Sequence, residues 1–181
     1  MSSPIRLSEP GARSATFEQP FEMLQACHER VHRMLALLGK LRDHITQHGA
    51  DDQARQAARD VMRYFDQAAP QHHRDEELHV FPPLLAQGEP KTVEIVKQLQ
   101  HDHEQMESGW QRARQLLAAV AEGQLQALTP DQGAALDAFA GLYAQHITHE
   151  ETIAYPQVRQ LVDDSAIKAM GEEMAKRRGI V

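Results

Sequence analysis

One motif that occurs twice restricts the fold of this chain more than any other feature of its sequence. His72-His-Arg-Asp-Glu-Glu-Leu-His-Val-Phe-Pro82 and His146-Ile-Thr-His-Glu-Glu-Thr-Ile-Ala-Tyr-Pro156 both read His, three residues, Glu-Glu, three residues, an aromatic residue and Pro. The two copies lie 74 positions apart, and a shift of 75 positions places His28 over His103. We therefore predict a duplicated helical hairpin whose two copies are related by a pseudo-twofold axis.

The spacing of apolar residues predicts helices throughout the chain. Between residues 93 and 120, buried-type side chains recur at alternating steps of three and four, as expected for one face of a long helix: Val93, Val96, Leu99, His103, Met106, Trp110, Ala113, Leu117 and Val120. Similar stripes occupy residues 24–45, 54–76 and 136–153. Because runs of β-branched residues with period two are absent, the expected class is all-α.

Short polar connections between the four segments predict antiparallel neighbours and hence an up-down-up-down four-helix bundle. Asp51 and Thr129 are predicted helix caps, and Pro130 suits a first helical position. Pro70 lies inside the second segment, where it removes a hydrogen bond and is expected to kink or divide the helix. We expect a flexible arm at residues 1–16, the bundle at 17–163, and a short fifth helix with a tail at 164–181.

Charge and composition exclude several kinds of partner. The net charge is −7 and the chain has no long basic run, so nucleic acid is not an expected partner. No apolar stretch is long enough to cross a membrane, and the first residues do not resemble a secretory signal. The single cysteine, Cys27, excludes an intramolecular disulfide framework and fits a reducing compartment, so we expect a cytoplasmic protein.

Histidine is the abundant functional residue, with 11 in the chain. Several histidines and glutamates lie on helix faces that should be buried, where unpartnered polar groups cost several kcal/mol each. A His and a Glu at positions i and i+4 lie on one helix face and can bind one metal or two adjacent metals. Four imidazoles with two carboxylates suit iron, manganese or zinc, and the twofold repeat favours two metals bridged by the glutamates.

The second segment offers two possible registers, His72 with Glu76 or His73 with Glu77. The second copy of the motif decides between them, because it has isoleucine where a second histidine would be needed. We therefore select His72 and Glu76. Glu77 and its counterpart Glu151 are then either surface charges or carboxylates that orient the ligand imidazoles through hydrogen bonds.

Some histidines leave alternatives open. His32, His73 and His79 lie close enough to the ligand face for any of them to be a further ligand. His28-Glu29-Arg-Val-His32 also matches the His-Glu-x-x-His pattern of zinc proteases, which makes a zinc-dependent hydrolase an alternative function. That alternative leaves the duplication and the other inward-facing histidines unexplained.

The doubled motif resembles the hemerythrin-like family, whose members contain the HHE cation-binding domain. The resemblance covers about residues 20–160 and implies a non-haem di-iron centre with an oxo or hydroxo bridge. It implies six metal ligands in this sequence: His28, His72, Glu76, His103, His146 and Glu150.

The resemblance further implies that the centre meets dioxygen, nitric oxide or peroxide, in oxygen or redox sensing, iron handling or stress repair. Oxygen carriers of this family have a second histidine one turn along the third helix, whereas Leu99 and Glu107 flank His103 here. This difference argues against simple oxygen storage. A binding module and a di-iron enzyme, peroxidase-like or nitric-oxide-handling, both stay open, as does a homodimer.

Overall fold

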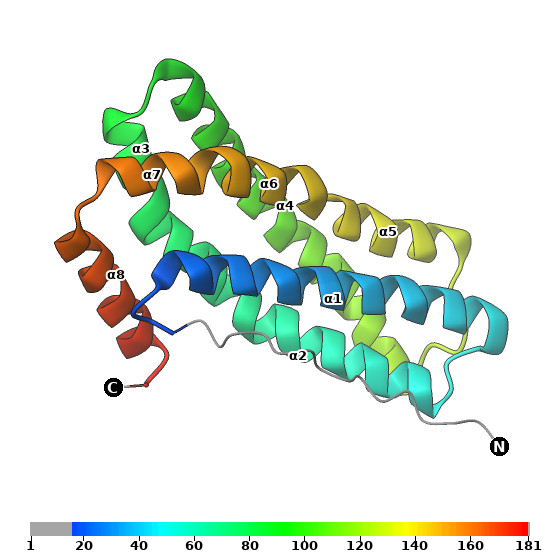
Figure 1. The fold of residues 1–181 in the computed structure, drawn as a ribbon. Helices are drawn as coiled ribbons and strands as arrows, with labels where there is room; N and C mark the ends of the chain where they lie inside the picture. The colour runs from blue at the N-terminus through cyan, green and yellow to red at the C-terminus, as the bar shows by residue number, and fades with distance from the viewer. Residues whose placement is uncertain (1–15, 181) are drawn as a thin grey trace.

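The structure, a computed structural model, describes residues 16–180, and its regular elements are all helical (Figure 1). This confirms the predicted all-α class for the described residues. The predicted arm lies outside them except for Thr16. The elements in chain order are α1 (Pro20–His48), α2 (Asp52–Asp75), η1 (Glu76–Val80), α3 (Phe81–Gln87), α4 (Pro90–Ala121), α5 (Pro130–Gly141), α6 (Tyr143–His149), η2 (Glu150–Ala154), α7 (Tyr155–Leu161) and α8 (Asp164–Arg177).

These elements combine into four rods that pack side by side. The rods are α1, α2 continued by η1 and α3, α4, and the run from α5 to α7. Helix α1 contacts α2 and α5, and α4 contacts the same two helices, so each rod lies between two others. Helix α8 contacts α1 and lies across one end of the molecule (Figure 1).

Two apolar clusters form the core, and a polar layer separates them. Along α1, Leu24 belongs to one cluster and Val31 to the other, with buried His28 between them. Along α4, Leu99 and Met106 flank His103 in the same way. The polar layer is therefore enclosed by hydrophobic packing on both sides, which keeps it largely out of contact with water.

Predicted caps hold two of the helix starts. The Asp51 side chain accepts a hydrogen bond from the backbone N–H of Ala54 at 2.9 Å, and Thr129 forms a reciprocal capping box with Gln132. The predicted fifth helix is α8, which is capped by Asp163. The sequence signals for helix ends are thus confirmed at these positions.

Pro70 does not divide α2, contrary to one of the two predicted outcomes. The helix continues through Pro70 to Asp75, and the departure from α-helical geometry comes later, in the π-helical turns η1 and η2. Each π-turn precedes a proline at the second position of the next helix, Pro82 or Pro156. Because proline has no N–H and its ring crowds the carbonyl four residues earlier, Pro82 and Pro156 disfavour regular α-helical hydrogen bonds at these turns, although Pro70 leaves α2 continuous.

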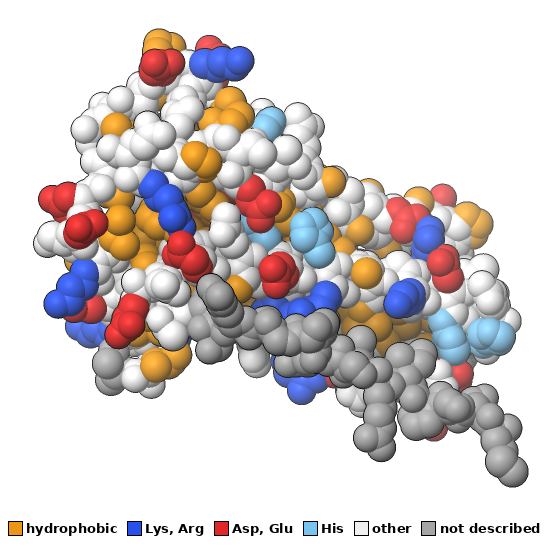
Figure 2. Space-filling view, viewed as in Figure 1, with side chains coloured by type: hydrophobic (Ala, Val, Ile, Leu, Met, Phe, Trp, Pro, Cys, Tyr) orange, Lys and Arg blue, Asp and Glu red, His pale blue; other side chains and the backbone are white. Residues whose placement is uncertain are grey.

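The surface that Figure 2 shows carries acidic and basic side chains interspersed with hydrophobic ones. Exposed large hydrophobic residues among those described are few: Leu78, Leu161 and Ile180. None of the described helices combines the length and the apolar character that crossing a membrane requires.

Candidate metal centre

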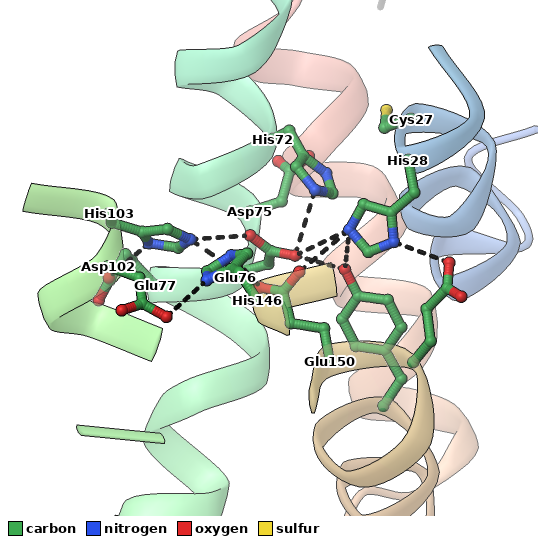
Figure 3. Close-up of polar contacts among 12 residues, drawn as sticks. Cys27, His28, His72, Asp75, Glu76, Glu77, Asp102, His103, His146 and Glu150 are labelled. Atoms are coloured by element: carbon green, nitrogen blue, oxygen red, sulfur yellow. Dashed lines mark hydrogen bonds and ion pairs between the residues drawn. The ribbon is translucent and has the colours of Figure 1, made fainter. Parts of the chain in front are cut away.

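All six predicted ligands lie in the polar layer and point toward one another (Figure 3). Their exposed fractions range from 0% to 8%, so they are buried although each is polar or charged. Four different rods supply them: His28 from α1, His72 and Glu76 from α2 and η1, His103 from α4, and His146 and Glu150 from α6 and η2. The structure thus brings together every residue in the predicted set.

The six residues form two overlapping groups of four. His28 and His72 make one group with both glutamates, and His103 and His146 make the other group with the same two glutamates. In each group, one possible ligand atom from every residue lies within 4.8 Å of the others. Glu76 and Glu150 therefore lie between the two groups, as bridging carboxylates would.

The donor atoms fit a metal because they face one another across the centre. Nε2 of His28 and Nε2 of His146 each lie 3.0 Å from the Glu150 carboxylate, and Nε2 of His103 lies 3.4 Å from Oε2 of Glu76. Buried charged groups of this kind are either paired or bound to a metal. Imidazole nitrogen with carboxylate oxygen is a donor set for iron, manganese or zinc.

Three of the four imidazoles are held from behind by a carboxylate at Nδ1. This contact fixes the ring and leaves Nε2 directed toward the centre. Of the two roles considered for Glu77 and Glu151, the structure thus favours the orienting one, and it adds Asp102, which the sequence reasoning missed. The pairs are His28 with Glu151 at 2.9 Å, His103 with Glu77 at 3.0 Å, and His146 with Asp102 at 3.3 Å.

The aromatic residue of each motif copy stacks on a histidine of the centre. Tyr155 stacks on His28 with ring centroids 5.6 Å apart, and Phe81 stacks on His103 at 5.5 Å. The π-turns place them there, because the backbone N–H of each aromatic residue donates to the carbonyl of the motif glutamate five residues earlier. The Tyr155 hydroxyl donates a hydrogen bond to Glu76 and lies 3.2 Å from Nε2 of His28.

Without metal, the centre holds protons on imidazoles. Burial favours neutral histidine, but the hydrogen bond and charge of Glu150 outweigh it and raise the pKa of His28 to about 9. Glu76 and Glu77 act in the same way against burial at His103, where the pKa rises to about 10. Burial and the charge of Glu150 raise the pKa of Glu76 to about 7. Metal ions would therefore have to displace protons from this site.

Other histidines lie outside the two groups. The side chains of His32 and Glu29 are exposed, so the zinc-protease pattern does not converge on a site with His28. His79 pairs with Glu173 at 2.7 Å. His73 stacks on the His103 ring at 4.1 Å but belongs to neither group.

Asp75, which the sequence reasoning missed, anchors the C-terminal helix beside the centre. Its carboxylate is fully buried one residue before Glu76. Arg178 donates to both of its oxygens, at 3.1 and 2.6 Å, and Arg177 donates to one at 2.9 Å. The basic pair near the end of the chain is thus a structural contact of α8 with the second rod.

Comparisons with known proteins agree with the geometry. The profile of the Hemerythrin HHE cation binding domain matches residues 19–158, which include all six predicted ligands. A protein of Haemophilus influenzae, described only as uncharacterized, is 31% identical over 176 residues, covering 97% of this chain and 99% of that protein. A metal-binding role, with iron as the typical cation, accords with the buried His and Glu groups. The chain belongs to the hemerythrin HHE cation-binding family.

Proposed function

We propose that this protein binds two iron ions in an up-down-up-down four-helix bundle, with Glu76 and Glu150 bridging the two positions. The observation that carries the proposal is that both glutamates belong to both groups of four potential ligands. Each position then has two imidazoles and two shared carboxylates. Zinc or manganese would suit the same donors, so the identity of the metal is part of what the experiment must test.

The proposed role is an interaction with dioxygen, nitric oxide or peroxide, in oxygen or redox sensing, iron handling or stress repair. Bound iron would supply reversible electron exchange and a coordination position for such a small molecule. The protein contributes the surroundings. Its outer carboxylates fix the imidazoles, Tyr155 donates a hydrogen bond to Glu76, and the two apolar clusters exclude water.

Sensing or turnover suits the site better than oxygen storage. One turn on either side of His103 are Leu99, which is buried in an apolar cluster, and Glu107, which is exposed, so no fifth imidazole comes from α4. Of the three histidines considered as extra ligands, none joins either group. The centre thus lacks the additional histidine that the family resemblance implies for oxygen carriers.

Metal analysis of the protein reconstituted with ferrous iron tests the proposal. We expect two iron ions per chain, and a loss of affinity of more than about tenfold in Glu76→Gln and in Glu150→Gln. Glu29→Gln is the matched control because Glu29 is exposed on α1. This variant protein should bind iron as the wild-type protein does. Failure to take up iron, or full retention of both ions in the two bridging variants, would contradict the proposal.

Rapid-mixing spectroscopy then separates a binding module from an enzyme. Reduced protein is mixed with dioxygen, nitric oxide or hydrogen peroxide, and the visible spectrum is followed. A reversible spectral change with no net consumption of the added molecule supports sensing. Consumption of many molecules per protein supports catalysis.

A further inference from the structure

A groove between α2 and α4 reaches the candidate metal centre at one point. Its cavity volume is about 800 Å³, which falls in the range of small-molecule sites. Of the six predicted ligands, only His103 lines this groove. Two smaller grooves, of about 500 and 250 Å³, contain none of the six.

The inner part of the groove suits an apolar molecule. Phe65, Ala69 and Met106 line it and are buried members of an apolar cluster. His73 also lines it and stacks on His103, so the inner end of the groove is an imidazole surface next to the centre. A molecule in the groove would lie against apolar side chains and face the His103 side of the site.

The other side of the centre is closed. Tyr155 covers His28 by stacking, and its hydroxyl lies against Nε2 of that histidine. The corresponding aromatic residue in the other motif copy is Phe81, which stacks on His103 and has no hydroxyl. His28 is 2% exposed and His103 is 8% exposed, the highest value among the six. The groove therefore borders the centre on its His103 side and not on its His28 side.

The charges that line the groove disfavour anions. Four carboxylates line it, from Asp66, Glu77, Glu104 and Glu107, against two guanidinium groups and the imidazolium of His103, which is paired with Glu77. One of the guanidinium groups, that of Arg114, is already paired with Asp66 at 2.9 Å. Excess negative charge around a concave site lowers the local concentration of anions.

We propose that this groove binds a small uncharged molecule with an apolar body, such as an undissociated organic hydroperoxide, and places it against the His103–His146 position. The placement at metal rests on the proposed function, whereas binding in the groove does not require metal. Trp110 makes binding in the groove measurable, because it lines the groove and is the only tryptophan in the chain.

Benzyl alcohol and benzoate are suitable probes, since they share an aromatic ring and differ in charge. In metal-free protein at low salt, we expect benzyl alcohol to change Trp110 fluorescence saturably and benzoate to have little effect. Ala69→Met should fill the groove and weaken benzyl alcohol binding by about tenfold or more. Ala68→Met, the same change at the neighbouring residue outside the groove lining, should leave binding within about twofold.

Equal binding of benzoate, or equal losses in the two methionine variants, would overturn the proposal. If Ala69→Met does not fold, the wild-type chain still decides the question by NMR, because benzyl alcohol must shift the signals of groove residues and not those of another surface. With cobalt(II) in the centre, bound benzyl alcohol should show strong paramagnetic relaxation. A protein that takes up no metal refutes the proposed function alone, whereas metal uptake without this relaxation refutes the placement.

Discussion

Replacement of Arg177 and Arg178 by alanine tests whether the buried Asp75 carboxylate holds α8 against the second rod. The Asp75 side chain is 0% exposed, and the two guanidinium groups, each 18% exposed, are its ion-pair partners. Arg177 supplies one hydrogen bond and Arg178 supplies two. Arg177→Ala, Arg178→Ala and the double variant therefore remove the partners of Asp75 in steps.

The expected losses are not additive. Arg177→Ala leaves two hydrogen bonds on Asp75 and should cost about 1 kcal/mol of unfolding free energy. The double variant leaves the buried carboxylate without a cation, and such changes cost roughly 3–5 kcal/mol. For a chain of 181 residues, where each kcal/mol corresponds to about 2–4 °C, the double variant should melt about 10 °C lower.

Urea unfolding and thermal melting of metal-free protein, followed by circular dichroism, measure these losses. The matched control is Lys168→Ala with Lys176→Ala, which removes two positive charges from exposed positions of the same helix. The control should change stability by less than about 1 kcal/mol. If the double arginine variant has the same urea midpoint and melting temperature as this control, the buried Asp75 carboxylate does not need these two arginines, and the reasoning is wrong.

Further changes probe the centre itself. Tyr155→Phe removes the hydrogen bond to Glu76 and should lower the unfolding free energy of metal-free protein by about 1–3 kcal/mol. The Tyr143 hydroxyl has no hydrogen bond among the described residues, so Tyr143→Phe should have little effect. Equal losses of unfolding free energy in the two variants, measured by urea unfolding, would contradict this. Since the pKa values of His28 and His103 are raised to about 9 and 10, metal uptake at neutral pH should release protons, and metal affinity should fall as the pH falls. A pH indicator in weak buffer measures the release, and no release on metal uptake would contradict this prediction. Chelation of bound metal should lower the melting midpoint by roughly 10 °C, given about 4 kcal/mol from metal at a thousandfold excess over Kd, and an unchanged midpoint would count against a filled centre.

The duplicated motif and the apolar stripes together were sufficient to predict which six residues meet. Helical periodicity fixes the direction of each side chain, so His28 and His103 could be assigned to the interior from the apolar stripes that contain them. The choice of His72 over His73 depended on the second motif copy, and the structure brings His72 into the centre. Local spacing and internal repetition thus determine the inward set without tertiary information.

Contacts between rods could not be predicted in this way. Asp102 reaches His146 across 44 positions of sequence, and Asp75 reaches Arg178 across 103. Nothing in the local pattern around either aspartate distinguishes it from a surface charge. The π-turns were not predicted either, although each motif proline, Pro82 or Pro156, follows one of the turns.

The two motif copies differ at the aromatic residue that stacks on a histidine of the centre. Their histidines and glutamates occupy equivalent places, but the stacked aromatic residue is Phe81 in one copy and Tyr155 in the other. The hydroxyl of Tyr155 contacts His28 and also Glu76, which both groups share, whereas the groove borders the centre at His103. A single oxygen atom in one half of a duplicated fold thus distinguishes the Tyr155 side of the centre from the side that the groove borders. Both glutamates belong to both groups of potential ligands, so a change at either glutamate bears on both groups.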